Sequence, residues 1–96
     1  IPDNAKAHYN LAIALYQHEQ VDEAIECYQR AIELMPDYAN AHHNLGMALY
    51  KKGEADAAIE HYRKAIELDP NHASVRNSLG VALYQKNKLD EAIEQY

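Results

Sequence analysis

Histidines are the side chains of this 96-residue sequence best suited to metal binding or proton transfer. The six are His8, His18, His42, His43, His61 and His72. No two of them lie four residues apart, the spacing that puts two ligands on one helix face, and the sequence has a single cysteine. Zinc requires a closed set of nitrogen and sulfur ligands, so we expect no metal site.

The other reactive groups do not form a catalytic pattern. Cys27 recurs as His61 and Gln95 at the same place in a repeating pattern, and no base is positioned to activate its thiol. The carboxylate pair Asp22-Glu23 lies where a helix should begin, so it complements the helix dipole. The three glycines follow no strand and form no phosphate-binding loop. We expect no enzymatic activity and no cofactor.

Charge and composition limit the partners and the compartment. The net charge of −6 disfavours nucleic acid, which is bound through Lys and Arg. No apolar run approaches the roughly 20 residues that span a bilayer, and the first residues form no secretion signal. One cysteine permits no internal disulfide, which fits a reducing compartment. We expect a cytoplasmic protein, and the absence of an initiator Met predicts that the chain is a piece of a longer one.

A 34-residue repeat organises the whole chain. Its three prolines, Pro2, Pro36 and Pro70, are each 34 residues apart. The surrounding residues repeat in the same register: Ala14-Leu15-Tyr16 returns as Ala48-Leu49-Tyr50 and as Ala82-Leu83-Tyr84. Agreement at this many positions predicts one domain, 1–96, built of units at about 5–38, 39–72 and 73–96, the last one truncated.

Each unit contains two helical patterns separated by a short turn. The patterns run from about 5 to 18 and 22 to 33, from 39 to 52 and 55 to 68, and from 73 to 86 and 89 to 96. Proline cannot continue a helix, so each unit ends near its proline. We expect the polar residues that follow, Asp3-Asn4, Asp37 and Asn71, to cap the next helix. Short turns make the paired helices antiparallel neighbours.

The repeat resembles the tetratricopeptide repeat family, whose pattern is W-x2-L-G-x2-Y, then A-x3-F, then P. The second unit has His42-x2-Leu45-Gly46-x2-Leu49, Ala58-x3-Tyr62 and Pro70. The departures are His8, His42 and Arg76 at the Trp position, Ala12 for Gly, and Leu at the first Tyr. The resemblance covers nearly the whole chain and implies an all-α solenoid of stacked antiparallel helix hairpins, a superhelix. It also implies that Tyr28, Tyr62 and Tyr96 are core residues.

The first helix of each unit has two apolar faces. With about 100° per residue, Ala7, His8, Ala14 and Leu15 lie on the same side as Leu11 and form the core stripe. Tyr9, Ile13 and Tyr16 lie on the opposite side, and the later units repeat this second face as His43, Met47 and Tyr50 and as Asn77, Val81 and Tyr84. The second face either lines a surface groove or packs inside the stack.

In the resembled family the matching positions line a concave groove that binds peptides. The residues carried over are Lys6, Tyr9, Asn10, Ile13, Tyr16, Asn40, His43, Asn44, Met47, Tyr50, Lys51, Asn77, Val81 and Tyr84. Tyrosines offer contact area with a hydroxyl group, Asn amides can pair with a peptide backbone, and Met is adaptable. We therefore expect a non-catalytic scaffold that binds a protein or peptide segment.

The sequence constrains the chemical nature of the ligand less than it constrains the residues of the groove. Some family members clamp an acidic C-terminal tail with Lys, Asn and Arg. Asn44 fits this clamp, but Ser74 and Ser78 replace its Lys and Arg, and Tyr9 and Ile13 replace its Lys and Asn. We expect an apolar or mixed peptide instead, with basic residues attracted by the net negative charge.

Two other functions remain open. The alternative to a peptide scaffold is a self-assembly module that stacks through open repeat ends, where Leu79, Leu83, Leu89 and Ile93 would be exposed. An RNA-binding helical repeat is disfavoured because it would need a basic groove.

Overall fold

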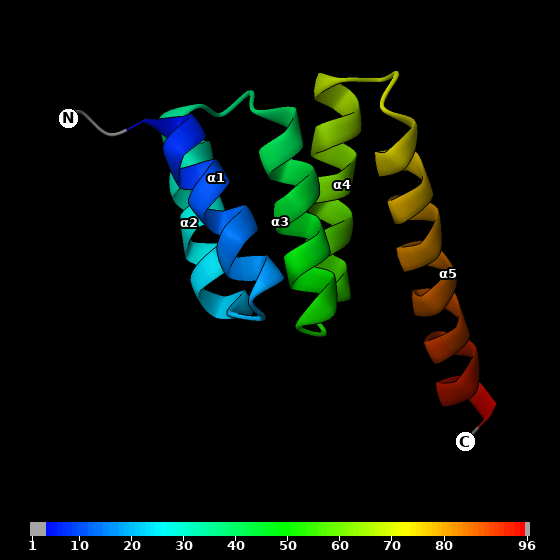
Figure 1. Cartoon of the computed structure of the whole chain (residues 1–96). Helices are drawn as coiled ribbons and strands as arrows, with labels where there is room; N and C mark the ends of the chain where they lie inside the picture. Colours follow the sequence, from blue (N-terminus) through cyan, green and yellow to red (C-terminus); the bar gives the residue numbers. More distant parts are fainter. Residues whose placement is uncertain (1–3, 96) are drawn as a thin grey trace.

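The computed structural model describes the backbone of residues 4–95 and the side chains of residues 4–90 (Figure 1). Its helices are α1 (Ala5–Gln17), α2 (Val21–Leu34), α3 (Ala39–Lys51), α4 (Ala55–Leu68) and α5 (Ala73–Gln95). All regular structure in the described residues is α-helical. The predicted all-α class is confirmed, and the first four helices begin and end within two residues of their predicted limits.

The helices stack in chain order. α1 packs against α2 and α3 against α4 as antiparallel hairpins, while α2 contacts α3 and α4 contacts α5 (Figure 1). α3 also touches both α1 and α5, so the first helices of the units lie along one side of the stack. This is the predicted solenoid of helix hairpins.

The ends of the helices follow from local chemistry, with one exception. Asn4 caps α1 as expected, since its Oδ1 accepts a hydrogen bond from the Lys6 backbone N–H at 2.8 Å. The prediction that Asp37 caps α3 is wrong, because Tyr38 occupies the cap position and no side chain caps that helix. The two hairpin turns contain Glu19 and Gly53 at φ +63° and +95°, the left-handed conformation that reverses the chain between paired helices.

The core is built from small residues and tyrosine rings. Tyr28 and Tyr62 are only 2% and 3% exposed, which confirms their predicted core positions, whereas the Tyr96 side chain lies outside the described residues. A methyl group added to Gly46 would lie 2.6 Å from the Tyr62 ring, closer than carbon atoms can approach. The absence of a side chain at Gly46 therefore lets α3 and α4 pack against each other through that ring.

The predicted core stripe of α1 is mostly wrong: Ala7, Leu11 and Ala14 are exposed, His8 and Leu15 are half-buried, and the buried residue of the helix is Ala12. Leu11 is 52% exposed, although its repeat counterpart Leu45 is 1% exposed. Leu45 belongs to α3, which packs between α2 on one side and α4 on the other. In the described residues α1 has no helix on its outer side, so Leu11 keeps only half of the environment that buries Leu45.

The prediction of two helices in the third unit is wrong. Residues 73–95 form one continuous helix, with Asn87 in the helix where the first two units have their left-handed turn residue. The chain therefore does not reverse in the third unit at the position where the first two units turn. The C-terminal half of α5 consequently extends past the ends of α3 and α4 (Figure 1).

Two polar contacts recur with the repeat. At the position of the family's Trp, His42 Nε2 lies 3.0 Å from the Pro36 carbonyl oxygen, and Arg76 Nε lies 3.1 Å from that of Pro70. These side chains tie the start of each first helix to the loop before it. Between units, Lys52 Nζ lies 2.8 Å from Asp22 and Lys86 Nζ 2.7 Å from Asp56, but these exposed ion pairs contribute little to stability.

We predict that Gly46→Ala lowers the free energy of unfolding by about 1–3 kcal/mol, because the new methyl group displaces the Tyr62 ring. Urea unfolding followed by circular dichroism measures the change. The same substitution in a Tyr62→Leu background is the control, and there it should cost much less. Equal costs in the two backgrounds would show that the ring does not limit the approach of α3 and α4.

Candidate functional site

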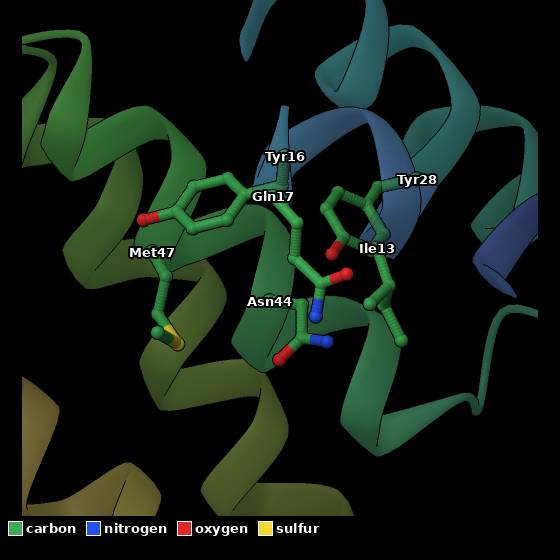
Figure 2. Close-up of a pocket in the computed structure, with 6 residues that line it drawn as sticks. All are labelled: Ile13, Tyr16, Gln17, Tyr28, Asn44 and Met47. Carbon is green, nitrogen blue, oxygen red and sulfur yellow. The ribbon is translucent and has the colours of Figure 1, made fainter. Parts of the chain in front are cut away.

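A groove runs along the side of the stack formed by α1, α3 and α5. Its first hollow, of about 260 Å³, lies between α1 and α3 (Figure 2). The residues that line it are Ile13, Tyr16, Gln17, Tyr28, Asn44 and Met47. Their surface is mainly apolar, and amide groups from Gln17 and Asn44 stand at its edge (Figure 2).

Two further hollows continue the groove toward α5. The second measures about 420 Å³ and is lined by Tyr16, Met47, Tyr50, Lys51, Tyr62, Asn77, Ser78 and Val81. The third measures about 620 Å³ and is lined by Arg76, Asn77, Gly80, Val81, Tyr84, Gln85 and Lys88. The first two share Tyr16 and Met47, and the last two share Asn77 and Val81, so the hollows are contiguous. We call their combined lining the groove.

Most of the residues predicted from the sequence lie in this groove. They are Ile13, Tyr16, Asn44, Met47, Tyr50, Lys51, Asn77, Val81 and Tyr84. Lys6, Asn10 and Asn40 are exposed but line none of the three hollows. Tyr9 and His43 are held in contacts between helices, as described below.

Sequence reasoning missed several lining residues. Gln17 and Gln85 flank the second face on the helical projection but were not carried over to the groove, whereas Lys88 lies one helical turn beyond Tyr84, an i+4 spacing that could have identified it. Tyr28 and Tyr62 were assigned wholly to the core, yet an edge of each ring reaches the groove floor. Burial raises the pKa of both phenols to about 12, so they stay neutral and can donate a hydrogen bond.

Tyr9 joins α1 to the second unit. Asn44 Nδ2 donates a hydrogen bond to the Tyr9 hydroxyl at 3.1 Å. The Tyr9 ring centre lies 4.8 Å from that of Tyr38 and 6.0 Å from that of Tyr28, which places three aromatic rings in contact. Tyr9 therefore fixes the position of Asn44 beside the first hollow.

His43 packs between helices instead of lining the groove. Its Nε2 lies 3.1 Å from the Ser78 hydroxyl on α5, and its ring meets the rings of Tyr62 and His72 edge-on. Burial, followed by the charge of a protonated His72, lowers the pKa of His43. His43 thus holds α3 against α5 in its neutral form.

A second histidine pair joins α3 to α4. Since the Pro36 carbonyl accepts from His42 Nε2, that nitrogen carries the hydrogen, and His42 Nδ1 must accept from His61 Nδ1, 3.2 Å away. The stacked rings have centres 5.4 Å apart. Burial, and then the charge on a protonated His42, lower the pKa of His61. If both rings were protonated, both facing nitrogens would carry a hydrogen and this hydrogen bond would be lost.

The charge of the groove is opposite to that of the whole chain. Lys51, Arg76 and Lys88 are among its lining residues and no carboxylate is. Residues 5–17, 39–51 and 73–89, the first helices of the units, contain no acidic residue at all. Lys51 Nζ lies 5.2 Å from the Tyr16 ring centre, and Lys88 Nζ lies 5.0 Å from that of Tyr84. The location of the acids therefore does not support the expected attraction of a basic peptide.

Within residues 4–90 no three His, Cys, Asp or Glu side chains come together to hold a metal ion. Among the described helices, none combines the length and the apolar character needed to cross a membrane.

Stacked helix hairpins with an open groove along their first helices define a helical-repeat solenoid. The TPR repeat family matches residues 14–53 and 46–86, and the chain belongs to this family. No curated protein matches the sequence.

Solved structures share this fold. Two crystal structures of MamA, each 37% identical, superpose with TM-scores of 0.86 and 0.85 over 95% of this chain. The chain spans 53% and 50% of the lengths of those MamA chains. The second TPR domain of Spaghetti (RPAP3), bound to the HSP90 peptide SRMEEVD, is 26% identical with a TM-score of 0.86 over 96% of this chain and 85% of that one.

We predict that the protein loses stability as the pH falls through the histidine range. A histidine whose pKa is lowered in the fold binds its proton more readily in the unfolded chain. Stability is therefore complete above the ordinary pKa of 6.5, falls as the pH drops below it, and levels off under the lowered value.

Thermal unfolding at pH values from about 7.5 to about 5.5 measures this effect, and each kcal/mol lost should lower Tm by roughly 4–8 °C. His61→Gln, which introduces the residue found at repeat position Gln95, should flatten the profile. His18→Gln, at an exposed site, is the control and should leave it unchanged. A wild-type Tm independent of pH would show that the pairs are not linked to folding.

Proposed function

We propose that the chain is a non-catalytic scaffold whose groove binds an extended or helical segment of a partner protein. One observation carries this proposal: three contiguous hollows along α1, α3 and α5 combine apolar and tyrosine surface with cations and no carboxylates. Such a surface can bury apolar side chains of a ligand while polar groups at its edge fix the orientation. The non-catalytic character rests on family membership and on the sequence patterns above.

The solved structures support a peptide as the ligand. The RPAP3 domain, which has the same fold, is bound to the HSP90 peptide SRMEEVD. In this chain Ser74 and Ser78 replace the Lys and Arg of a two-carboxylate clamp. We therefore propose that the groove recognises side chains within a segment of the partner protein and that binding does not require a C-terminal carboxylate.

The lining also favours one kind of segment. Tyr16, Met47 and Val81 offer apolar contacts in the shared parts of the hollows, and Met adapts to different ligand shapes. Lys51 and Lys88 stand over tyrosine rings at two points of the groove, where they can pair with a carboxylate. We propose a segment with apolar or aromatic residues that alternate with acidic or amide residues.

We predict that Tyr16→Ala, Tyr50→Ala and Tyr84→Ala together weaken binding at least about 100-fold, since each buried contact of about 1 kcal/mol reduces affinity several-fold. Ligands come from a displayed random-peptide library, and fluorescence polarisation measures their Kd. Leu34→Ala, on the exposed side of α2, is the matched control and should not change the Kd. Unchanged binding by the triple variant, with its helical content intact, would contradict the groove proposal.

We predict that Lys51→Glu and Lys88→Glu each weaken an acidic ligand roughly tenfold, and that the loss shrinks at high salt. Lys64→Glu is the control, because Lys64 lies on α4 and pairs with Glu67 away from the groove residues. Selection of mainly basic peptides from the library would contradict the proposed ligand while leaving the groove itself in place.

A further inference from the structure

The first two hollows of the groove are copies of one another. Each of the six residues that line the first hollow has a counterpart 34 residues later, one repeat length, that lines the second hollow. Tyr16 in the first hollow thus corresponds to Tyr50 in the second, and Tyr28 on the floor of one corresponds to Tyr62 on the floor of the other. A ligand that crosses the groove therefore meets the same subsite twice.

Each subsite offers the same combination of chemical groups. Besides the tyrosines, its walls contain two aliphatic side chains, Ile13 and Met47 in the first hollow and Met47 and Val81 in the second. A nitrogen that can donate a hydrogen bond belongs to each, the amide of Gln17 in the first (Figure 2) and the ammonium of Lys51 in the second. Each subsite can therefore bury one apolar side chain and donate to one oxygen of a ligand.

Helix packing sets the distance between the two subsites. The first hollow lies between α1 and α3, and the second contains residues of α3 and α5, so the two are one repeat unit apart. α3 contacts both α1 and α5, and the axes of packed helices lie about 8–10 Å apart. A ligand that fills both hollows must therefore present two side chains on one side, separated by roughly that distance.

The conformation of the ligand backbone decides whether it can meet this spacing. In a polyproline II helix every third residue lies on the same side, and these residues are about 9.3 Å apart. Residues on one face of a β-strand are about 6.6 or 13 Å apart, which is too close or too far. In an α-helix, residues seven apart lie near the same face at about 10.5 Å. Spacing thus favours polyproline II or an α-helix over a strand.

The hydrogen-bond donors of the subsites favour polyproline II over the α-helix. The backbone carbonyls of a polyproline II segment make no internal hydrogen bonds and are free to accept from Gln17 and Lys51. The carbonyls of an α-helix are already bonded within the helix. Proline-rich segments also suit aromatic surfaces, because their preformed conformation loses little entropy on binding.

We propose that the partner segment is proline-rich and binds in the polyproline II conformation, with apolar residues three apart in the sequence that fill the two hollows. This rests on the proposed function and adds the backbone conformation and the period of the ligand. An acidic residue of the segment beside the second hollow pairs with Lys51, whose Nζ lies 5.2 Å from the Tyr16 ring centre. The first hollow contains the neutral Gln17 at the same repeat position, so the charge fixes which end of the segment lies there.

Labelled synthetic peptides that differ in the spacing of two leucines test the proposal. In a proline background, which holds each peptide in polyproline II, the leucines are two, three or four residues apart. Fluorescence polarisation should give the three-residue spacing a Kd at least about tenfold lower than the other two, because only that peptide fills both hollows at once. A peptide with the same spacing but glycine in place of proline should bind more weakly, since it lacks the preformed conformation.

Blocking one hollow shows whether the spacing preference comes from the two subsites. Val81→Arg places a long charged side chain in the wall of the second hollow, and Val81 is 47% exposed, so the variant should keep its fold. The three-residue peptide should then bind no better than the other spacings. Gln29→Arg adds the same charge at an exposed position of α2 and is the matched control, in which the preference should persist.

Two results would overturn this inference. One is equal affinity for all three spacings, and the other is tighter binding of an alanine-based helical peptide with leucines seven residues apart. If such binding were still lost with Tyr16→Ala, Tyr50→Ala and Tyr84→Ala together, the groove would remain the binding site. Binding of no peptide at all, from this set or from the random library, would overturn the proposed function as well.

Discussion

The close approach of paired helices is the constraint on which the rest of the structure depends. In the second hairpin the Tyr62 ring occupies the space that a side chain at Gly46 would fill, and fully buried alanines such as Ala58 and Ala65 keep the neighbouring contacts short. Because each hairpin is thin, the next one can pack against it in the same register. That register places the second faces of α1, α3 and α5 side by side and so creates the groove. Among the described residues, none supplies a comparable ring beside Gly80.

Charge is divided between the two kinds of helix. Every acidic residue of the sequence lies outside residues 5–17, 39–51 and 73–89, so the net charge of −6 belongs to the second helices, the turns and the chain ends. The carboxylates therefore do not contribute to the lining of the groove. The groove carries Lys51, Arg76 and Lys88 instead. The net charge of the whole chain conceals this division between the helices.

At the family's Trp position, His42 offers less apolar surface than a tryptophan would, but its ring nitrogens make directed hydrogen bonds. His42 reaches the Pro36 carbonyl with one ring nitrogen and His61 with the other, and thereby links a loop, α3 and α4. Arg76 Nε donates to the Pro70 carbonyl at the same repeat position. A buried hydrogen-bonded pair fixes the orientation of the helices, and it is lost when both rings are protonated, because both facing nitrogens then carry a hydrogen. Stability and pH are coupled here because a polar group replaces an apolar one.

The all-α class, the limits of the first four helices and most residues of the groove could be predicted from the sequence, because a 34-residue period fixes which faces recur and helical geometry fixes which residues share a face. The same pattern identified Tyr28 and Tyr62 as core residues. The neighbours of each repeated position could not be predicted in this way, because they depend on how the helices pack. Leu11 is exposed beside one helix where Leu45 is buried between two, and α5 runs straight where the repeat predicts a turn. The local sequence pattern determines which residues share a helix face. Whether that face is buried, and whether the chain turns back on itself, depends on the helix that packs against it.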